Sequence, residues 1–206
     1  MKNFLFSLAT FLMQPIVRLL FRTKCVGAEN VPEDGGVILV SNHINALDPF
    51  FIAVFMKRQF CCLAKKELFK NKLFGKIISS MGIIPVDRTS VGRERIDSAL
   101  NVLSEEKVLC FFPQGTRYPG KDPRETVPKS GVGLFAYHSK CPVVPVNIST
   151  KNMRIKPFQK TTVTFGKPIK YEELGFEKGS INEYRSVAAY VFDKICLLGE
   201  SKEDKK

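Results

Sequence analysis

The chain has 206 residues, of which 44% are hydrophobic, so it can form one domain with a well-buried core, and disorder along most of its length is excluded. Its 32 lysines and arginines against 20 acidic residues give a formal net charge of +12. That charge suits nucleic acid, an anionic membrane surface or a phosphorylated substrate, and it does not by itself choose among them.

The first 24 residues form the most apolar stretch, with four positive charges and no acidic residue. A signal peptide would need a small-residue cleavage site after the apolar run, but Arg18, Arg22 and Lys24 occur there instead. A membrane span needs about 20 apolar residues, and Gln14, Pro15 and Arg18 interrupt this run. We therefore predict a helix, broken or kinked near Pro15, that lies in the headgroup region of an anionic membrane. A helix packed on the protein's own core is the alternative.

Short apolar and β-branched runs after this segment predict strands, and longer runs with helical spacing predict helices between them. The predicted strands are residues 37–43, 60–64, 82–88, 108–113, 141–150 and 161–169. The predicted helices are residues 48–57, 68–82, 93–107, 132–140 and 181–198. This alternation predicts a single-domain α/β fold with a mostly parallel or mixed central sheet flanked by helices. We assign the domain to residues 25–199, after the membrane-associating segment 1–24 and before a polar, disordered tail at 200–206.

His43 and Asp48 follow the first predicted strand and are five residues apart. On a continuous helix they would point about 140° away from each other, so they can meet only if a turn separates the strand from a helix that begins near Asp48. Asp48 and Pro49 are a favourable N-cap and first-turn pair for such a helix. A carboxylate there can accept the imidazole N–H and stabilise the imidazolium. A capping aspartate near an unrelated loop histidine remains the alternative.

The expected target of such a base is a hydroxyl group of a bound substrate. A serine nucleophile is disfavoured, because the sequence contains no G-x-S-x-G elbow. The contexts of Ser41 and Ser130 do not resemble an activated nucleophile either.

Two arginines follow other predicted strands: Arg88 ends the run GIIPVDR, and Arg117 lies in FPQGTR. Because the carboxyl ends of such strands gather at one edge of the sheet, we expect both near His43. Gly115 lets the backbone approach a ligand, and Thr116 adds a hydroxyl and an N–H. Together with guanidinium groups these suit a phosphate. Arginines that only solvate the surface or form salt bridges are the alternative.

Four blocks in this order, NHINALD, GIIPVDR, FPQGTR and VVPVNI, resemble those of the membrane-associated glycerolipid acyltransferases, most closely the 1-acylglycerol-3-phosphate (lysophosphatidate) acyltransferases. The resemblance runs roughly from Gly27 to Ile169; its first and third blocks are specific, and the other two are weak alone. It implies an O-acyltransferase of phospholipid biosynthesis. Such an enzyme transfers a fatty acyl group from acyl-CoA or acyl carrier protein to the free hydroxyl of 1-acyl-sn-glycerol 3-phosphate and forms phosphatidate.

By position, the resemblance makes His43 the general base and Asp48 its orienting partner. The substrate-binding residues that it implies are Arg88, Gln114, Gly115, Thr116, Arg117, Lys65 and Lys129. Neither a metal nor a bound cofactor is expected, because a thioester is already activated. The sequence departs from the family pattern at one position that bears on the choice of acceptor: Gln114 stands where the family usually has glutamate. Another lysolipid, glycerol 3-phosphate or a non-catalytic lipid-binding role are therefore the alternatives.

The expected partners are a lysophospholipid, the acyl donor and an anionic membrane surface, with the protein peripheral or monotopic at the cytoplasmic face. Each CH₂ of an acyl chain prefers apolar surroundings by about 0.8 kcal/mol, so acceptor and product stay at the interface. Nucleic acid is not an expected partner, because the basic residues are spread and most phenylalanines lie in apolar runs. The six cysteines lack metal-ligand spacing, so we expect reduced thiols and no zinc site.

Overall fold

The computed structural model describes residues 2–71, 75–76, 78–79, 82–86 and 92–200. Within these residues a seven-stranded sheet has the order β1-β7-β6-β2-β5-β3-β4. Its strands are β1 (Thr23–Val26), β2 (Val37–Ser41), β3 (Phe60–Lys65), β4 (Ile83–Val86), β5 (Val108–Phe111), β6 (Val143–Thr150) and β7 (Thr161–Phe165). Neighbouring strands pair in parallel except β6 and β7, which are antiparallel. The predicted α/β fold with a mixed central sheet is confirmed.

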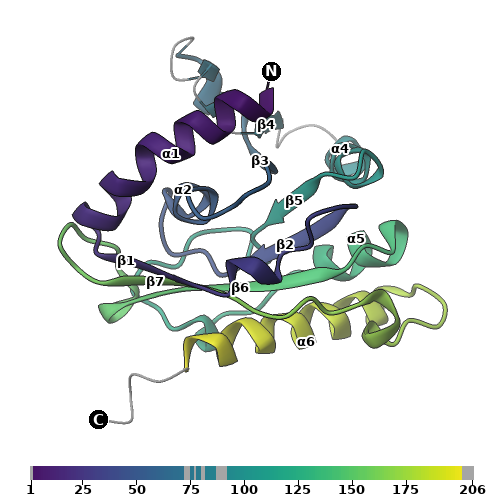
Figure 1. Ribbon diagram of the computed structural model, residues 1–206. Helices are drawn as coiled ribbons and strands as arrows, with labels where there is room; N and C mark the ends of the chain where they lie inside the picture. Colours follow the sequence, from purple (N-terminus) through teal and green to yellow (C-terminus); the bar gives the residue numbers. More distant parts are fainter. Residues whose placement is uncertain (1, 72–74, 77, 80–81, 87–91, 201–206) are drawn as a thin grey trace.

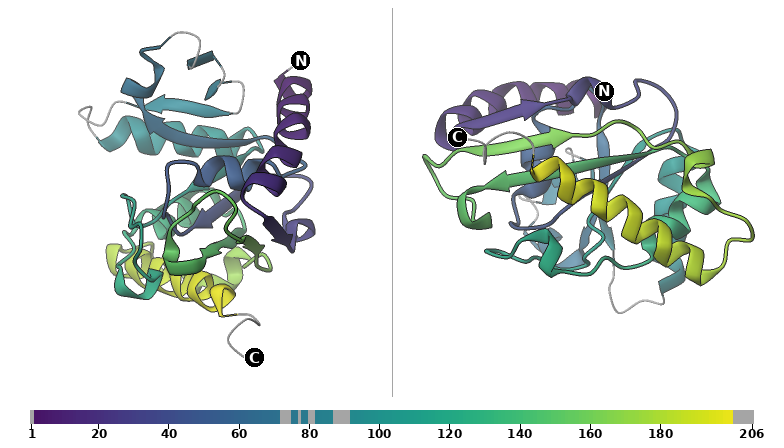
Figure 2. Two further views of the ribbon diagram at one scale, coloured as in Figure 1. Left: turned by 90° about the vertical axis from the view of Figure 1, so that its left-hand side faces the viewer. Right: turned by 90° about the horizontal axis from the view of Figure 1, so that it is seen from below.

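Helices cover both faces of this sheet (Figure 1). They are α1 (Lys2–Leu20), α2 (Asp48–Ala53), α4 (Gly92–Ser104), α5 (Gly131–Ser139) and α6 (Ile181–Gly199). One core cluster joins α1 and α2 to one face of the strands, and a second joins α4, α5 and α6 to the other face. The views in Figure 2 show α1 and α6 on opposite sides of the sheet. The helix predicted at 68–82 falls partly outside the described residues; the 3-10 helix η2 (Lys66–Phe69) precedes that part.

The two central strands β2 and β6 have the composition that is expected in a mostly parallel sheet covered on both faces. Every residue of β2 is buried, and so are the first six residues of β6. A strand covered by helices on both faces contains an unbroken apolar run rather than alternating residues, as VILVS and VVPV do. At the edge of the sheet, β4 accommodates Pro85, which lacks the N–H that a second neighbouring strand would need.

Asn42 fixes the point at which the chain leaves β2. Its Nδ2 donates to the carbonyl oxygen of Ile148 at 2.9 Å, and its Oδ1 accepts the Ile148 N–H at 2.8 Å. The amide thus replaces a peptide group of the ladder, so both backbone groups of Ile148 stay paired where the backbone of β2 turns away. His43 therefore begins its loop from a fixed position.

The helix α1 has two apolar faces. Phe6 and Val17 are buried in the core cluster that α2 also joins. The opposite side carries apolar side chains that are largely exposed, namely Leu8, Phe11, Leu12, Ile16 and Leu19. The helix continues across Pro15 without a break. Both alternatives from the sequence thus describe part of this helix: it packs on the protein's own core, and it presents an apolar surface outward.

The start of the sheet lies earlier than the sequence pattern suggested. β1 begins at Thr23, inside the segment 1–24 that we assigned to the membrane, and it pairs with β7 from Thr23↔Thr161 onward. α1 and β1 are therefore folded together with the domain. Among the described residues, no helix combines the length and the apolarity that crossing a membrane requires.

Candidate active site

The loops that follow β2 and β5 form the candidate site. These strands are parallel neighbours, with Val40 opposite Phe111 in register, so their carboxyl ends lie side by side. The loop after β2 carries His43 and leads into α2 at Asp48. The loop after β5 carries Gln114 and Arg117. The expectation that these residues gather at one edge of the sheet therefore holds for these two loops.

His43 and Asp48 form a direct hydrogen bond, with 2.7 Å between Nδ1 of the imidazole and Oδ2 of the carboxylate. The same Oδ2 accepts the backbone N–H groups of Ile44 at 2.7 Å and Asn45 at 2.9 Å. Asp48 is fully buried, and its Oδ1 has no hydrogen-bond partner among the described residues. The capping prediction was therefore wrong: Leu47 occupies the N-cap position of α2, and Asp48 instead closes the preceding turn.

This contact determines the tautomer of His43. An ionised carboxylate can only accept hydrogen bonds, so the proton must lie on Nδ1, and Nε2 keeps a free lone pair. The ring of Phe112 stacks on the imidazole, with centroids 4.1 Å apart and planes inclined by 21°. The side chain of His43 is 18% exposed. The geometry therefore presents an oriented base that a substrate can reach.

The backbone of His43 is held by the loop after β5. Its N–H donates to Oε1 of Gln114 at 2.7 Å, and its carbonyl oxygen accepts the N–H of Tyr118 at 2.8 Å. The other end of the Gln114 side chain donates from Nε2 to Oγ1 of Thr126 at 2.7 Å. Gln114 is only 3% exposed. Both ends of its amide are thus bonded within the protein, although the sequence suggested that it contacts substrate.

His43 opens onto a pocket of about 490 Å³ over the carboxyl ends of β3 and β5. The pocket is mainly apolar and also contains two cationic side chains. Its lining residues are His43, Cys62, Leu63, Arg95, Ile96, Cys110, Phe111, Phe112, Pro113, Gly115, Lys129, Gly131 and Phe135. Such a lining can hold an acyl chain next to an anionic or strongly polar group.

Arg95 is a pocket residue that the sequence did not reveal. It lies in the second turn of α4, where a mixed run of charged residues is typical of a solvated helix face. Its Nε is buried and has no hydrogen-bond partner among the described residues. A buried guanidinium N–H without a partner is costly, so this atom is available to a ligand oxygen.

The remaining predicted residues lie at or near the same edge. Gly115 adopts φ +71°, where a side chain is strained, and a Cβ there would come within 3.0 Å of Nζ of Lys129. Thr116 and Arg117 are exposed on the same loop. Lys65 ends β3 and pairs in register with Val86. Arg88 lies outside the described residues.

Serine and cysteine side chains near His43 do not have the character of nucleophiles. Ser41 is buried, and its Oγ donates to the carbonyl oxygen of Asn42. Cys62 and Cys110 lie opposite each other in β3 and β5, and the Cys62 side chain together with burial raises the pKa of the Cys110 thiol well above its ordinary value. A thiol with a raised pKa stays protonated and unreactive. Among the described residues, no group of three or more His, Cys, Asp or Glu side chains could hold a metal ion.

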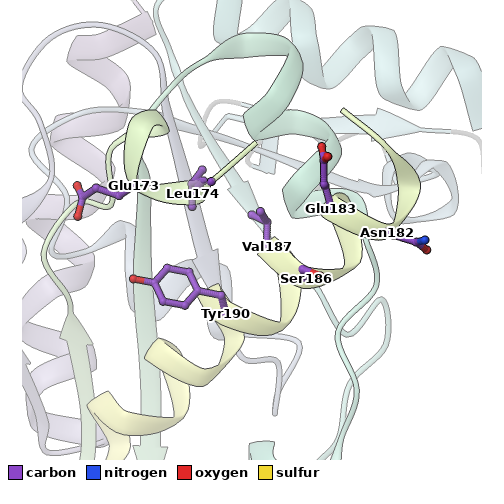
Figure 3. Close-up of a pocket in the computed structure, with 8 residues that line it drawn as sticks. Glu173, Leu174, Asn182, Glu183, Ser186, Val187 and Tyr190 are labelled. Carbon is purple, nitrogen blue, oxygen red and sulfur yellow. The ribbon is translucent and has the colours of Figure 1, made fainter. Parts of the chain in front are cut away.

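A second pocket, of about 460 Å³, lies between the 3-10 helix η5 (Tyr171–Leu174) and α6 (Figure 3), and His43 is not among the residues that line it. Its acidic side chains already accept hydrogen bonds from nearby backbone N–H groups. Glu173 accepts the N–H of Lys170 at 2.9 Å, and Glu183 accepts the N–H of Gly179 at 2.7 Å. These bonds complete helix starts, and no basic residue lines the pocket. Among the described residues, this pocket therefore offers no counterpart to His43 and its cationic neighbours.

Comparison with known proteins finds a matching family model and several relatives. A family model described as Acyltransferase matches residues 22–149. A 1-acyl-sn-glycerol-3-phosphate acyltransferase from Bacillus subtilis is 33% identical over 65% of this chain and 65% of its own length. Relatives of the same description from Streptococcus pneumoniae and Borreliella burgdorferi are also 33% identical, over 69% and 63% of this chain. The match spans 53% and 52% of their own lengths.

One solved structure resembles the whole chain. The crystal structure of the 1-acyl-sn-glycerophosphate (LPA) acyltransferase PlsC from Thermotoga maritima has a TM-score of 0.67, and the likeness covers 99% of this chain and 98% of that one. The two sequences are 20% identical, so this likeness shows the shared fold.

The tautomer of His43 can be tested without any substrate. In ¹⁵N-histidine-labelled protein at alkaline pH, we expect His43 to carry its proton on Nδ1, because Asp48 accepts that hydrogen bond. Asp48→Ala should remove this preference, whereas His138, the only other histidine, should not change. A wild-type spectrum with the His43 proton on Nε2 would contradict the assigned geometry.

Proposed function

The chain belongs to the acyltransferase family, and we propose that it transfers a fatty acyl group from acyl-CoA or acyl carrier protein to the free hydroxyl of 1-acyl-sn-glycerol 3-phosphate. One observation carries this proposal: Asp48 orients His43 at the mouth of a pocket that is both apolar and cationic. A base, an apolar surface and positive charge are what a lipid hydroxyl, an acyl chain and a phosphate require. The names of the relatives support the same acceptor.

In the proposed reaction His43 acts as general base through Nε2. The acceptor hydroxyl oxygen attacks the carbonyl carbon of the thioester while Nε2 takes the hydroxyl proton, and a C–O bond forms. The buried carboxylate of Asp48 stabilises the imidazolium that results. The tetrahedral intermediate then expels the thiolate as the C–S bond breaks, and His43 returns the proton to sulfur. The products are an ester and a free thiol, and no metal or bound cofactor takes part.

The phosphate of the acceptor is proposed to bind on the basic loops beside His43. Arg117 follows Gln114, whose side chain is bonded to the backbone of His43, so a phosphate on that loop keeps its glycerol hydroxyl near the base. Lys129 lies beside Gly115, where the backbone can approach a ligand closely. Arg88, Lys65 and Thr116 complete the proposed set from the family resemblance. Arg95, with its unpartnered Nε, supplies a further cation to the pocket.

The acyl chain of the donor is proposed to lie on the apolar part of the same pocket. Leu63, Ile96, Phe111 and Phe135 line it, from β3, α4, β5 and α5 respectively. Burying each CH₂ there is favourable by about 0.8 kcal/mol. The thioester carbonyl would then lie at the mouth of the pocket, next to Nε2 of His43.

We propose that the outer face of α1 attaches the protein to the cytoplasmic face of an anionic membrane. Leu19 is 77% exposed and Phe11 is 74% exposed, which is unusual for side chains of this size. Arg18, Arg22 and Lys24 cluster at the end of the helix. Apolar insertion together with attraction of about 1 kcal/mol per basic residue suits peripheral binding to anionic lipid.

The acceptor is tested by a panel assay. Thiol release and lipid product are measured with lysophosphatidate, other lysophospholipids and glycerol 3-phosphate, using acyl-CoA and acyl carrier protein as donors. We expect lysophosphatidate to be the preferred acceptor. Preference for another acceptor would redirect the proposal, and lipid binding without thiol release from any pair would replace it with a non-catalytic role.

Substitution of the base should abolish most turnover. His43→Ala is expected to lower kcat by at least about 10²-fold with folding intact, since a positioned general base contributes roughly 10²–10⁴ in rate. The matched control is His138→Ala on the exposed side of α5, which should retain wild-type turnover. Near-normal thiol release by the His43 variant would remove the base assignment.

Arg117 should affect binding of the acceptor more than binding of the donor. We expect Arg117→Ala to raise the KM for lysophosphatidate at least about tenfold, because a charge-assisted phosphate contact is lost, with little change in the donor KM. Arg124→Ala serves as control: it is exposed on the same loop, where its guanidinium pairs with Asp122 and Glu200. Equal effects on both substrates would argue against a phosphate-binding role.

Charges on the outer face of α1 should weaken membrane binding. Leu12→Glu combined with Leu19→Glu is expected to reduce co-sedimentation with anionic vesicles, without loss of thermal stability, because both side chains are exposed. Ile181→Glu places a charge at a comparably exposed apolar residue of α6 on the other side of the sheet and should bind as wild type. Undiminished binding by the double variant would place the membrane contact elsewhere.

A further inference from the structure

The hydrogen bonds that reach Gln114 run in one direction. The backbone N–H of His43 donates to Oε1, and this fixes the orientation of the amide because only its oxygen can accept. Nε2 then faces Thr126 and donates to Oγ1. The hydroxyl of Thr126 has one proton, and it donates that proton to the carbonyl oxygen of Pro123 at 2.6 Å. The same carbonyl oxygen also accepts the backbone N–H of Thr126 at 3.0 Å.

The side chain at position 114 has to serve two partners. An apolar side chain there would leave the backbone N–H of His43 without its acceptor and the hydroxyl oxygen of Thr126 without its donor. Loss of the Thr126 hydroxyl would in turn leave Nε2 of Gln114 without its acceptor, whereas the carbonyl oxygen of Pro123 would keep the N–H of Thr126. The contact between Gln114 and Thr126 therefore holds the side chain that accepts from His43.

The same contacts tie the base to the loop that carries the proposed phosphate ligand. Oε1 of Gln114 accepts the backbone N–H of His43, and the N–H of Tyr118 donates to the carbonyl oxygen of His43. The loop is therefore hydrogen-bonded to both backbone groups of that residue. Arg117 lies between these two contacts in sequence. Thr126, near the end of the 3-10 helix η3 (Pro123–Glu125), fixes the far side of the loop through Gln114.

We propose that Gln114 and Thr126 are positioning residues, which lock the Gly115–Tyr118 loop to the backbone of His43 through a hydrogen-bond relay. This inference deepens the proposed acyl transfer and rests on it for its kinetic test. The relay keeps the phosphate-binding loop and the base at one separation, so that an acceptor bound by its phosphate presents its hydroxyl to Nε2. Neither residue touches the reacting atoms.

A double-mutant cycle isolates the relay. Gln114→Met, Thr126→Val, the double variant and the conservative Thr126→Ser are compared with wild type. Gln114→Met and Thr126→Val remove the hydrogen bond between the two side chains from its two ends. We expect each to lower kcat roughly tenfold with the donor KM nearly unchanged, since a buried polar group is left unpaired. Thr126→Ser, which keeps the oxygen, should restore wild-type kcat.

The double variant decides between a relay and two separate contributions. A relay predicts that it loses about as much activity as the worse single variant, within roughly twofold. A loss equal to the product of the two single effects would overturn the relay. Wild-type kcat for Gln114→Met or for Thr126→Val would overturn it as well.

A measurement without turnover separates this inference from the proposed reaction. If the wild-type protein releases no thiol with any acceptor, the proposed reaction fails. The relay is then judged from hydrogen exchange of the His43 backbone amide. That amide should exchange roughly tenfold faster in Thr126→Val and Gln114→Met than in Thr126→Ser, because its acceptor is no longer held in place or is removed. Equal exchange in all three variants would refute the relay on its own terms.

Discussion

The carboxyl edge of the sheet is organised by a single buried oxygen atom, Oδ2 of Asp48. It accepts three N–H groups at 2.7–2.9 Å, two from the backbone and one from the imidazole. A carboxylate removed from water is strongly destabilised unless such donors replace its hydration. The turn at residues 43–47, the start of α2 and the tautomer of His43 are therefore consequences of one requirement, which is to satisfy that charge.

Two further amide side chains join this turn to the rest of the sheet, and both do so by imitating a peptide group. Asn42 supplies a donor and an acceptor to Ile148 of β6, while Gln114 accepts from His43 and donates to Thr126. An amide suits these positions because it has both functions in fixed geometry. His43 is thereby anchored to β6 on one side and to the loop that carries Arg117 on the other.

The sequence predicted most of the fold, and each shortfall has a physical cause. Unbroken apolar runs identify the buried strands, because a strand that is covered on both faces has apolar residues at every position. β1 went unnoticed because Thr23–Val26 is an edge strand of four residues with alternating burial, which blends into the preceding apolar segment. Asp48 was misjudged as a cap because capping preference is local, whereas its partners are set by how the turn closes. The inward direction of Gln114 and of Arg95 depends on tertiary packing, which residue type does not encode.

The way α1 is fastened has a consequence for the geometry of an interfacial reaction. Gln14 donates to the carbonyl oxygen of Val54, and the guanidinium of Arg18 lies 5.5 Å above the ring of Phe55, both just beyond α2. These contacts join the surface helix to the segment that begins with Asp48. In the proposed membrane-bound arrangement they set the height of His43 above the lipid plane. The headgroup of the proposed acceptor would then have to rise out of that plane to reach His43.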